Sequence, residues 1–146
     1  MADVLSAPAR TFLARHRIGH LATADAAGAP HVIPFCFALV DDTLYFVVDG
    51  KPKRKKGLAI KRMRNIAENP AVAVVVDDYD DDWNRLAYLL LRGRAAIVND
   101  EAVRNRALAA LREKYPQYRT MVLDGPDHPV VAITTECVHF WRAQRD

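Results

Sequence analysis

The chain has 146 residues, of which 51% are hydrophobic and 27% charged, a composition typical of soluble globular proteins. This length predicts a single domain over residues 1–146. No window approaches the roughly 18 apolar residues that a membrane span needs, so we expect no membrane partner. Residues 1–17 lack the apolar region of a secretory signal. With only two cysteines, in unrelated apolar runs, this predicts a cytoplasmic protein in which Cys36 and Cys137 are buried free thiols.

The net charge of +3 conceals a local asymmetry. Between Gly50 and Ala67 there are eight basic residues and no acidic residue. The eight are Lys51, Lys53, Arg54, Lys55, Lys56, Lys61, Arg62 and Arg64. Outside this basic stretch, 13 basic residues face 18 acidic ones, a net charge of −5. A local basic patch on an otherwise acidic chain predicts a local anionic partner.

The first third of the chain predicts one helix followed by three strands. In chain order we expect a helix near Pro8 and strands over residues 18–24, 30–40 and 43–48, with turns at 25–28 and 41–42. Leu5, Phe12 and Leu13 can share one face of the helix. Residues 30–40 are apolar on both faces, which indicates a strand buried on both sides, as in a closed or nearly closed barrel.

The remainder alternates helices with strands. We expect helices from about Leu58 to Glu68 and from Asp100 to just before Pro116, and strands over residues 71–76, 86–98 and 130–141. Gly93 falls within a long strand and predicts a β-bulge. Residues 77–82 form an acidic loop. The order predicts an α+β, mainly β fold, in which an antiparallel barrel carries helices at its ends.

Several common kinds of site find little support in the sequence. His16 and His20 are four residues apart, but the expected change from helix to strand between them removes the meaning of that spacing, so we expect no metal. Ser6 is the only serine, and no nucleophile motif surrounds it. The acidic loop lacks the spacing of an EF-hand. Neither a dinucleotide-binding glycine motif nor a phosphate-binding P-loop is present.

The basic stretch is open to three interpretations. It is a solvated loop, a nucleic-acid contact, or a site for the phosphate of a bound cofactor. Lysines and arginines just before a helix start are well suited to phosphate. Residues 51–66 contain no aromatic residue that could stack on bases, which weighs against nucleic acid. We therefore favour the cofactor phosphate and expect no nucleic-acid partner.

An ordered set of short motifs resembles the pyridoxamine 5'-phosphate oxidase-like split barrels, a family of dimeric flavin and deazaflavin proteins. The motifs are Leu21-Ala22-Thr23, Gly28-Ala29-Pro30-His31-Val32, Leu44-Tyr45-Phe46-Val47-Val48-Asp49, Lys61-Arg62-Met63-Arg64-Asn65-Ile66, Asn69-Pro70 and Val138-His139-Phe140-Trp141. The resemblance covers nearly the whole chain. It implies a split β-barrel like that of FMN-binding proteins, and a homodimer with the cofactor at the subunit interface.

The resemblance also implies positions for the cofactor. Lys61 and Arg62 match the pair that contacts the phosphate. The ring would be lined by residues from three strands, namely Pro34, Phe35, Cys36, Val47, Val48 and Tyr88, and Trp141 matches the C-terminal tryptophan of the family. The chain ends soon after Trp141, where true pyridoxamine phosphate oxidases continue to residues that hold the substrate. We therefore do not expect oxidation of vitamin B6.

Within the family, the motifs around Lys53-Arg54, Asn65-Ile66 and residues 79–85 are similar to a subgroup that uses coenzyme F-420. Lys53, Lys55 and Lys56 would suit the phosphate and polyglutamate tail of F-420. The expected activity is hydride transfer from this deazaflavin to a small conjugated or carbonyl-like acceptor. Tyr88, His31 or Trp83 could orient the acceptor, and no catalytic residue is assigned. An FMN-dependent protein of the same fold is the alternative, and a nucleic-acid-binding module is the second.

Overall fold

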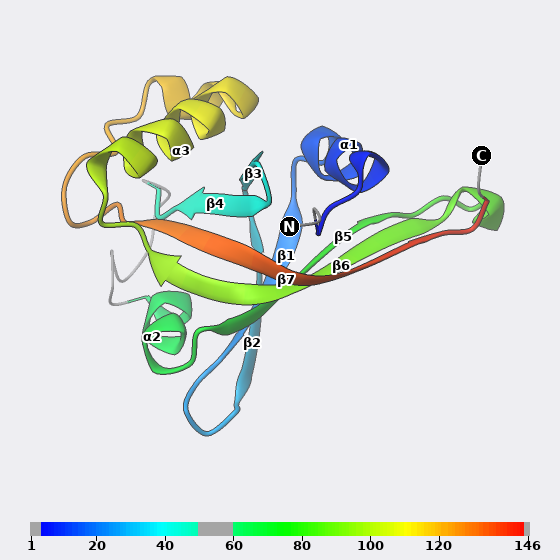
Figure 1. Ribbon diagram of the computed structural model, residues 1–146, viewed down its shortest axis with the longest axis horizontal. Helices are drawn as coiled ribbons and strands as arrows, with labels where there is room; N and C mark the ends of the chain where they lie inside the picture. Colours follow the sequence, from blue (N-terminus) through cyan, green and yellow to red (C-terminus); the bar gives the residue numbers. More distant parts are fainter. Residues whose placement is uncertain (1–3, 50–59, 145–146) are drawn as a thin grey trace.

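The computed structural model describes residues 4–49 and 60–144 (Figure 1). Within these ranges the helices are α1 (Ala7–Arg15), α2 (Lys61–Glu68) and α3 (Glu101–Lys114), with 3-10 turns η2 (Trp83–Arg85) and η3 (Pro116–Arg119). The strands are β1 (Gly19–Ala24), β2 (Pro30–Phe35), β3 (Ala38–Val40), β4 (Thr43–Val47), β5 (Ala71–Asp78), β6 (Ala87–Ile97) and β7 (Val130–Arg142). The described strands form one antiparallel sheet in the order β2-β1-β5-β6-β7-β4-β3.

The two strands that end this order, β2 and β3, are separated in the chain by only Cys36 and Phe37. The sheet must therefore curl until its two edges approach each other, which makes a split barrel. α3 covers β3 and β4, α1 packs beside β3, and α2 packs beside β1 (Figure 1). The predicted α+β, mainly β split barrel is confirmed. One part of the sheet, built from β5, β6 and β7, extends away from the barrel as a long arm (Figure 1).

The strand predicted over residues 30–40 is wrong in one respect, because it is two strands. β2 ends at Phe35 and pairs with β1, whereas β3 begins at Ala38 and pairs with β4. At the break, the backbone N–H of Phe37 donates a 3.0 Å hydrogen bond to the Tyr115 hydroxyl rather than to a strand. Apolar side chains continue on both sides of the break, so the pattern alone cannot reveal that the chain changes partners.

The other predicted boundaries agree closely with the structure. The bulge lies at Gly93, where the pairing with β7 shifts register. The Asp100 carboxylate accepts hydrogen bonds from the backbone N–H groups of Ala102 and Val103 at the start of α3. α2 begins at Lys61, later than the expected start at Leu58, which lies outside the described residues. β5 continues to Asp78, so the acidic loop is shorter than expected.

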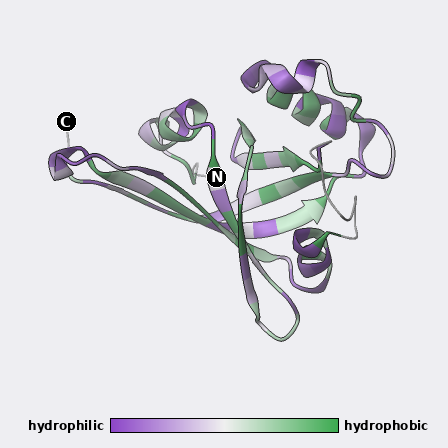
Figure 2. Ribbon diagram, turned by 180° about the vertical axis from the view of Figure 1, so that it is seen from behind, coloured by the Kyte–Doolittle hydropathy of each residue, from purple (hydrophilic) through white to green (hydrophobic). Residues whose placement is uncertain are grey.

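Two hydrophobic clusters hold the described part of the fold together. The larger lies inside the barrel and includes Phe12 and Leu13 from α1. The smaller lies under α3, where Leu108 and Leu111 pack on the outer side of the barrel with Tyr118. Figure 2 shows the hydrophilic colour on much of α3 and hydrophobic residues along the strands that it covers. α3 and η3 are therefore anchored to the barrel by apolar contacts.

The two thiols differ from the prediction. Cys36 is half-buried, and Cys137 is exposed on β7 rather than buried. The apolar run around Cys137 belongs to the arm, where fewer elements cover the sheet (Figure 1). Among the helices of residues 4–49 and 60–144, none has the length and hydrophobicity needed to cross a membrane.

Candidate functional site

A cavity of about 330 Å³ opens where the break between β2 and β3 meets the end of β4 and the start of α2. Four of its lining residues are predicted ring contacts, namely Pro34, Phe35, Cys36 and Val47. Arg62, the predicted phosphate contact, comes to the same cavity from α2. The fold thus brings together five of the residues that the sequence suggested, from segments that are distant in the chain.

Arg62 supplies the positive charge of this cavity. Burial lowers the pKa of Arg62, while the neighbouring Asp49 and Tyr118 act in the opposite direction. An arginine nevertheless stays protonated in proteins. Its Nε atom is buried and has no hydrogen-bond partner among the described residues. A guanidinium with a buried, unused Nε donor, beside an apolar cavity, is well suited to an anionic group.

Asp49 and Tyr118 also line the cavity, and the sequence did not suggest either as a site residue. The Tyr118 hydroxyl donates a 2.8 Å hydrogen bond to the Asp49 carboxylate. Burial, followed by this contact with Asp49, raises the pKa of Tyr118, so its hydroxyl stays protonated at physiological pH. The available signal was weak: Asp49 ends the third predicted strand, and Tyr118 follows Pro116 just beyond a predicted helix.

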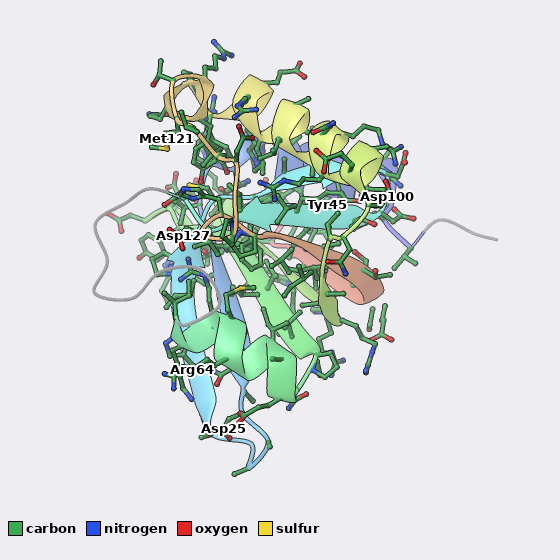
Figure 3. The ribbon with its side chains drawn as sticks, turned by 90° about the vertical axis from the view of Figure 1, so that its left-hand side faces the viewer. Asp25, Tyr45, Arg64, Asp100, Met121 and Asp127 are labelled. Carbon is green, nitrogen blue, oxygen red and sulfur yellow. The ribbon has the colours of Figure 1, made fainter. Side chains whose placement is uncertain are left out.

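Two predicted contacts lie near the cavity but do not line it. The Lys61 ammonium is 3.9 Å from the Asp25 carboxylate in the β1–β2 turn. Figure 3 shows Asp25 at the opposite end of the molecule from Met121, beyond α2. Val48 is buried in the core, and its backbone N–H donates to the Pro129 carbonyl. Neither side chain therefore faces the cavity in this chain.

Tyr88 and Trp141 lie elsewhere, on the arm. They are register partners in β6 and β7, and their ring centroids are 5.9 Å apart. The His139 ring is 5.6 Å from that of Tyr88. Trp141 is 40% exposed. These side chains form an aromatic surface on the arm, and they are not part of the cavity lining within one chain.

The remaining candidates are dispersed. Trp83 is 69% exposed in the turn η2, and His31 lies half-buried on β2 with a buried Nδ1 atom that has no partner among the described residues. Lys53, Lys55 and Lys56 lie outside the described residues. In the part of the chain that the structure covers, no group of three or more histidine, cysteine, aspartate or glutamate residues could hold a metal ion.

The family model for pyridoxamine 5'-phosphate oxidase matches residues 5–142. The chain belongs to this family. A curated reductase of 5a,11a-dehydrotetracycline and 5a,11a-dehydrooxytetracycline from Streptomyces rimosus is 34% identical over 68 residues, which is 47% of this chain and 45% of that protein. The chain thus matches less than half the length of that relative.

Two solved structures resemble nearly the whole chain. An F420 reductase is 28% identical, with a TM-score of 0.61 over 89% of this chain and 94% of its own. An FAD-binding protein from Mesorhizobium loti is 27% identical, with a TM-score of 0.65 over 92% of each chain. This member of the pyridoxamine 5'-phosphate oxidase family therefore has an oxidoreductase-type fold and resembles proteins named for deazaflavin and flavin ligands.

The residues present fit a flavin-like group. Pro34, Phe35, Cys36 and Val47 offer a mainly apolar wall for a flat ring, and Arg62 offers an unused buried donor for a phosphate. Asp49 lies beside Arg62 and provides the opposing charge. The cavity thus combines an apolar wall with one strongly polar side, as cofactor sites commonly do.

Proposed function

We propose that this protein is a reductase that binds coenzyme F-420 in the cavity beside Arg62. The observation that carries the proposal is the half-buried Arg62 side chain, whose buried Nε donor has no partner among the described residues. A buried donor without a partner costs about 1–3 kcal/mol, and an anionic ligand would remove that cost. The phosphate of the cofactor is therefore assigned to Arg62, and the ring to the wall formed by Pro34, Phe35, Cys36 and Val47.

When bound in its reduced form, the deazaflavin would supply the hydride for the acceptor, and solvent would supply the proton. The side chains of this chain bind the cofactor, position one another and exclude water. Phe35, which is buried, excludes water from one side of the cavity. Arg62 holds the anionic end of the cofactor. Tyr118 holds the Asp49 carboxylate by a hydrogen bond, and Asp49 in turn stabilises the charge of Arg62.

Two comparisons favour a deazaflavin reductase. One relative of similar length is named an F420 reductase, and the Streptomyces rimosus relative is named as a reductase of a conjugated polycyclic compound. The basic residues Lys53, Lys55 and Lys56 would meet the anionic tail of F-420. The acceptor would then be a conjugated or carbonyl-like small molecule.

FMN is the second candidate cofactor. It is favoured by the resemblance to an FAD-binding protein of 27% identity. The apolar wall and Arg62 would suit FMN equally well, because both cofactors carry a flat tricyclic ring and a phosphate on a ribityl chain. F-420 adds a long anionic tail beyond that phosphate. The choice between F-420 and FMN therefore depends on the lysines that precede α2 in the sequence, Lys53, Lys55 and Lys56.

A parallel titration with F-420 and FMN tests the proposal. Fluorescence of the cofactor or of tryptophan gives each dissociation constant with the full-length protein. We expect F-420 to bind more tightly than FMN, and at low salt the difference should increase because the tail contacts are ionic. If both cofactors bind more weakly than about 100 µM, which corresponds to roughly 5.5 kcal/mol of binding free energy, the proposal fails.

A further inference from the structure

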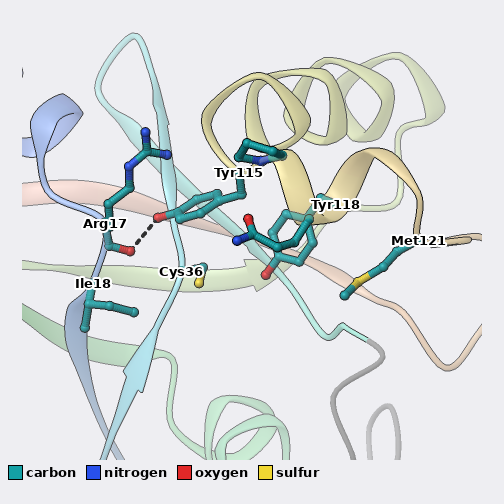
Figure 4. A pocket seen from close by; sticks show the side chains of 8 residues that line it. Arg17, Ile18, Cys36, Tyr115, Tyr118 and Met121 are labelled. Carbon is teal, nitrogen blue, oxygen red and sulfur yellow. Dashed lines mark hydrogen bonds between the residues drawn. The ribbon is translucent and has the colours of Figure 1, made fainter.

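A second cavity of about 520 Å³ adjoins the first (Figure 4). The two cavities share three lining residues, Ile18, Cys36 and Tyr118. The new wall is supplied by the segment after α3, including Tyr115 and Met121. Because the cavities share these three residues, a molecule in the second would lie next to a ring held in the first.

The hydroxyl groups of the two tyrosines that line this second cavity are both hydrogen-bonded to the protein. The Tyr115 hydroxyl accepts a hydrogen bond from the Phe37 N–H and lies 2.8 Å from the Arg17 carbonyl oxygen (Figure 4). The Tyr118 hydroxyl donates to Asp49. Burial raises the pKa of Tyr115 to about 12, so its ring stays neutral. With the polar ends of both tyrosines engaged by the protein, the wall is apolar and aromatic, and flat rings can stack on it.

One end of the second cavity is positively charged. The Arg17 guanidinium lies 5.8 Å from the centroid of the Tyr115 ring, and it donates to the backbone carbonyl of Lys114. The Lys114 ammonium does not line this cavity and lies 5.4 Å from the centroid of the same ring. No carboxylate of residues 4–49 and 60–144 lies within ion-pair distance of Arg17. The charge of Arg17 is therefore available to an anion in this cavity.

We infer that the second cavity receives the acceptor, and that this acceptor is a flat, largely apolar ring system with an anionic group at the Arg17 end. The inference rests on the proposed function for the role of the bound molecule. Transfer of a hydride requires reacting atoms about 3–3.5 Å apart, so the acceptor would have to meet the ring where both cavities are lined by Ile18, Cys36 and Tyr118. The rings of Tyr115 and Tyr118 select for an apolar, planar molecule, and Arg17 selects for its charge.

The probe 8-anilinonaphthalene-1-sulfonate has this chemistry and reports binding by fluorescence. Filling the cavity with Met121→Trp should weaken its binding by about tenfold, and Gln117→Trp, a change at a more exposed lining position, should do the same. The matched control is Val122→Trp, because Val122 is 77% exposed and does not line the cavity. Arg17→Gln should weaken binding of the sulfonate probe by about fivefold but should leave binding of the neutral N-phenyl-1-naphthylamine unchanged.

Alkylation of Cys36 shows whether the bound probe reaches the residues that the two cavities share, and the Met121 and Gln117 variants then assign the probe to the second cavity. In a Cys137→Ala protein, saturating sulfonate probe should slow the reaction of Cys36 with N-ethylmaleimide by about tenfold, because Cys36 belongs to the shared wall. In the matched Cys36→Ala protein, the probe should leave the reaction of the exposed Cys137 unchanged. Equal probe binding in Met121→Trp, Gln117→Trp and Val122→Trp, with no protection of Cys36, would overturn the inference.

The same measurements separate this inference from the proposed function. If F-420 binds but the probe shows neither the Met121 effect nor protection of Cys36, the acceptor cavity is wrong and the cofactor proposal stands. If the probe shows both effects but neither F-420 nor FMN binds, the cavity remains a site for an anionic ring system. Its role as an acceptor site then fails together with the proposed function.

Discussion

Lys114 is an unusual basic residue of the described chain, because its ammonium is held against apolar groups. It lies 3.8 Å from the centroid of the Phe37 ring and donates to the Leu13 carbonyl at 3.3 Å. Burial, and then the charge of Arg17, lower the pKa of Lys114 to about 8. The ring of Phe37 favours the charged form and offsets part of this cost. Lys114 therefore joins α3 to the barrel, but near neutral pH its partly buried charge lowers the free energy of unfolding.

The pKa of Lys114 predicts how stability changes with pH. Between pH 8 and the ordinary lysine pKa of 10.5, the unfolded chain binds more protons at this position than the folded chain. The free energy of unfolding should therefore rise as the pH increases from 8 to about 9.5, below the range in which tyrosines ionise. Urea denaturation at a series of pH values measures this rise. It should disappear in Lys114→Met and persist in Lys61→Met, and a rise of equal size in Lys114→Met would contradict the assignment.

At the scale of elements, the pairing of β6 with β7 depends on Gly93. Arg92 pairs with Cys137 and Gly93 with Thr135, so Glu136 is the extra residue, on β7. A Cβ atom on Gly93 would lie 2.2 Å from the backbone oxygen of Thr134, which cannot move without breaking the sheet. The bulge was predictable from the glycine, but the strand that carries the extra residue was not.

Gly93→Ala should therefore destabilise the protein by about 3 kcal/mol, at the upper end of the usual cost of overpacking. The matched control is Gly125→Ala. Gly125 has a φ of +90° but open space around the added methyl group, so only backbone strain of about 1 kcal/mol is expected. Urea denaturation of both variants gives the comparison. Equal destabilisation by the two variants would show that the close approach of β7 is not what requires glycine at position 93.

At the scale of the whole molecule, the resemblance predicted the split barrel, which the structure confirms, and a position for the cofactor, which stays a prediction. The alternation of apolar residues within the strands supports the barrel, because each strand buries side chains on a regular period. The sequence did not predict that the chain changes pairing strand at Cys36 and Phe37, from β1 to β4, because this change depends on contacts between distant segments. The contact between Asp49 and Tyr118 was also missed, since it joins residues 69 positions apart and depends on where η3 docks.

The arm explains why Tyr88 and Trp141 lie away from the cavity of their own chain. We propose a homodimer in which the arm of one subunit packs against the other, with the cofactor at the interface. Sedimentation equilibrium should then give twice the chain mass of 16.4 kDa. Trp141→Lys should weaken the dimer, and Ala96→Lys, an exposed change near the other end of β6, should not. A mass of 16.4 kDa for the unmodified protein would contradict this arrangement.

The central claim is that Arg62 holds the anionic end of a flavin-like cofactor, and titration of two neighbouring variants tests it most directly. Arg62→Gln should raise the dissociation constant for F-420 by about tenfold or more, because a buried charge-assisted hydrogen bond is lost. Lys61→Gln should change it by less than about threefold, since the Lys61 side chain is 41% exposed and faces Asp25. Unchanged affinity in Arg62→Gln, with weakened binding in Lys61→Gln, would contradict the account.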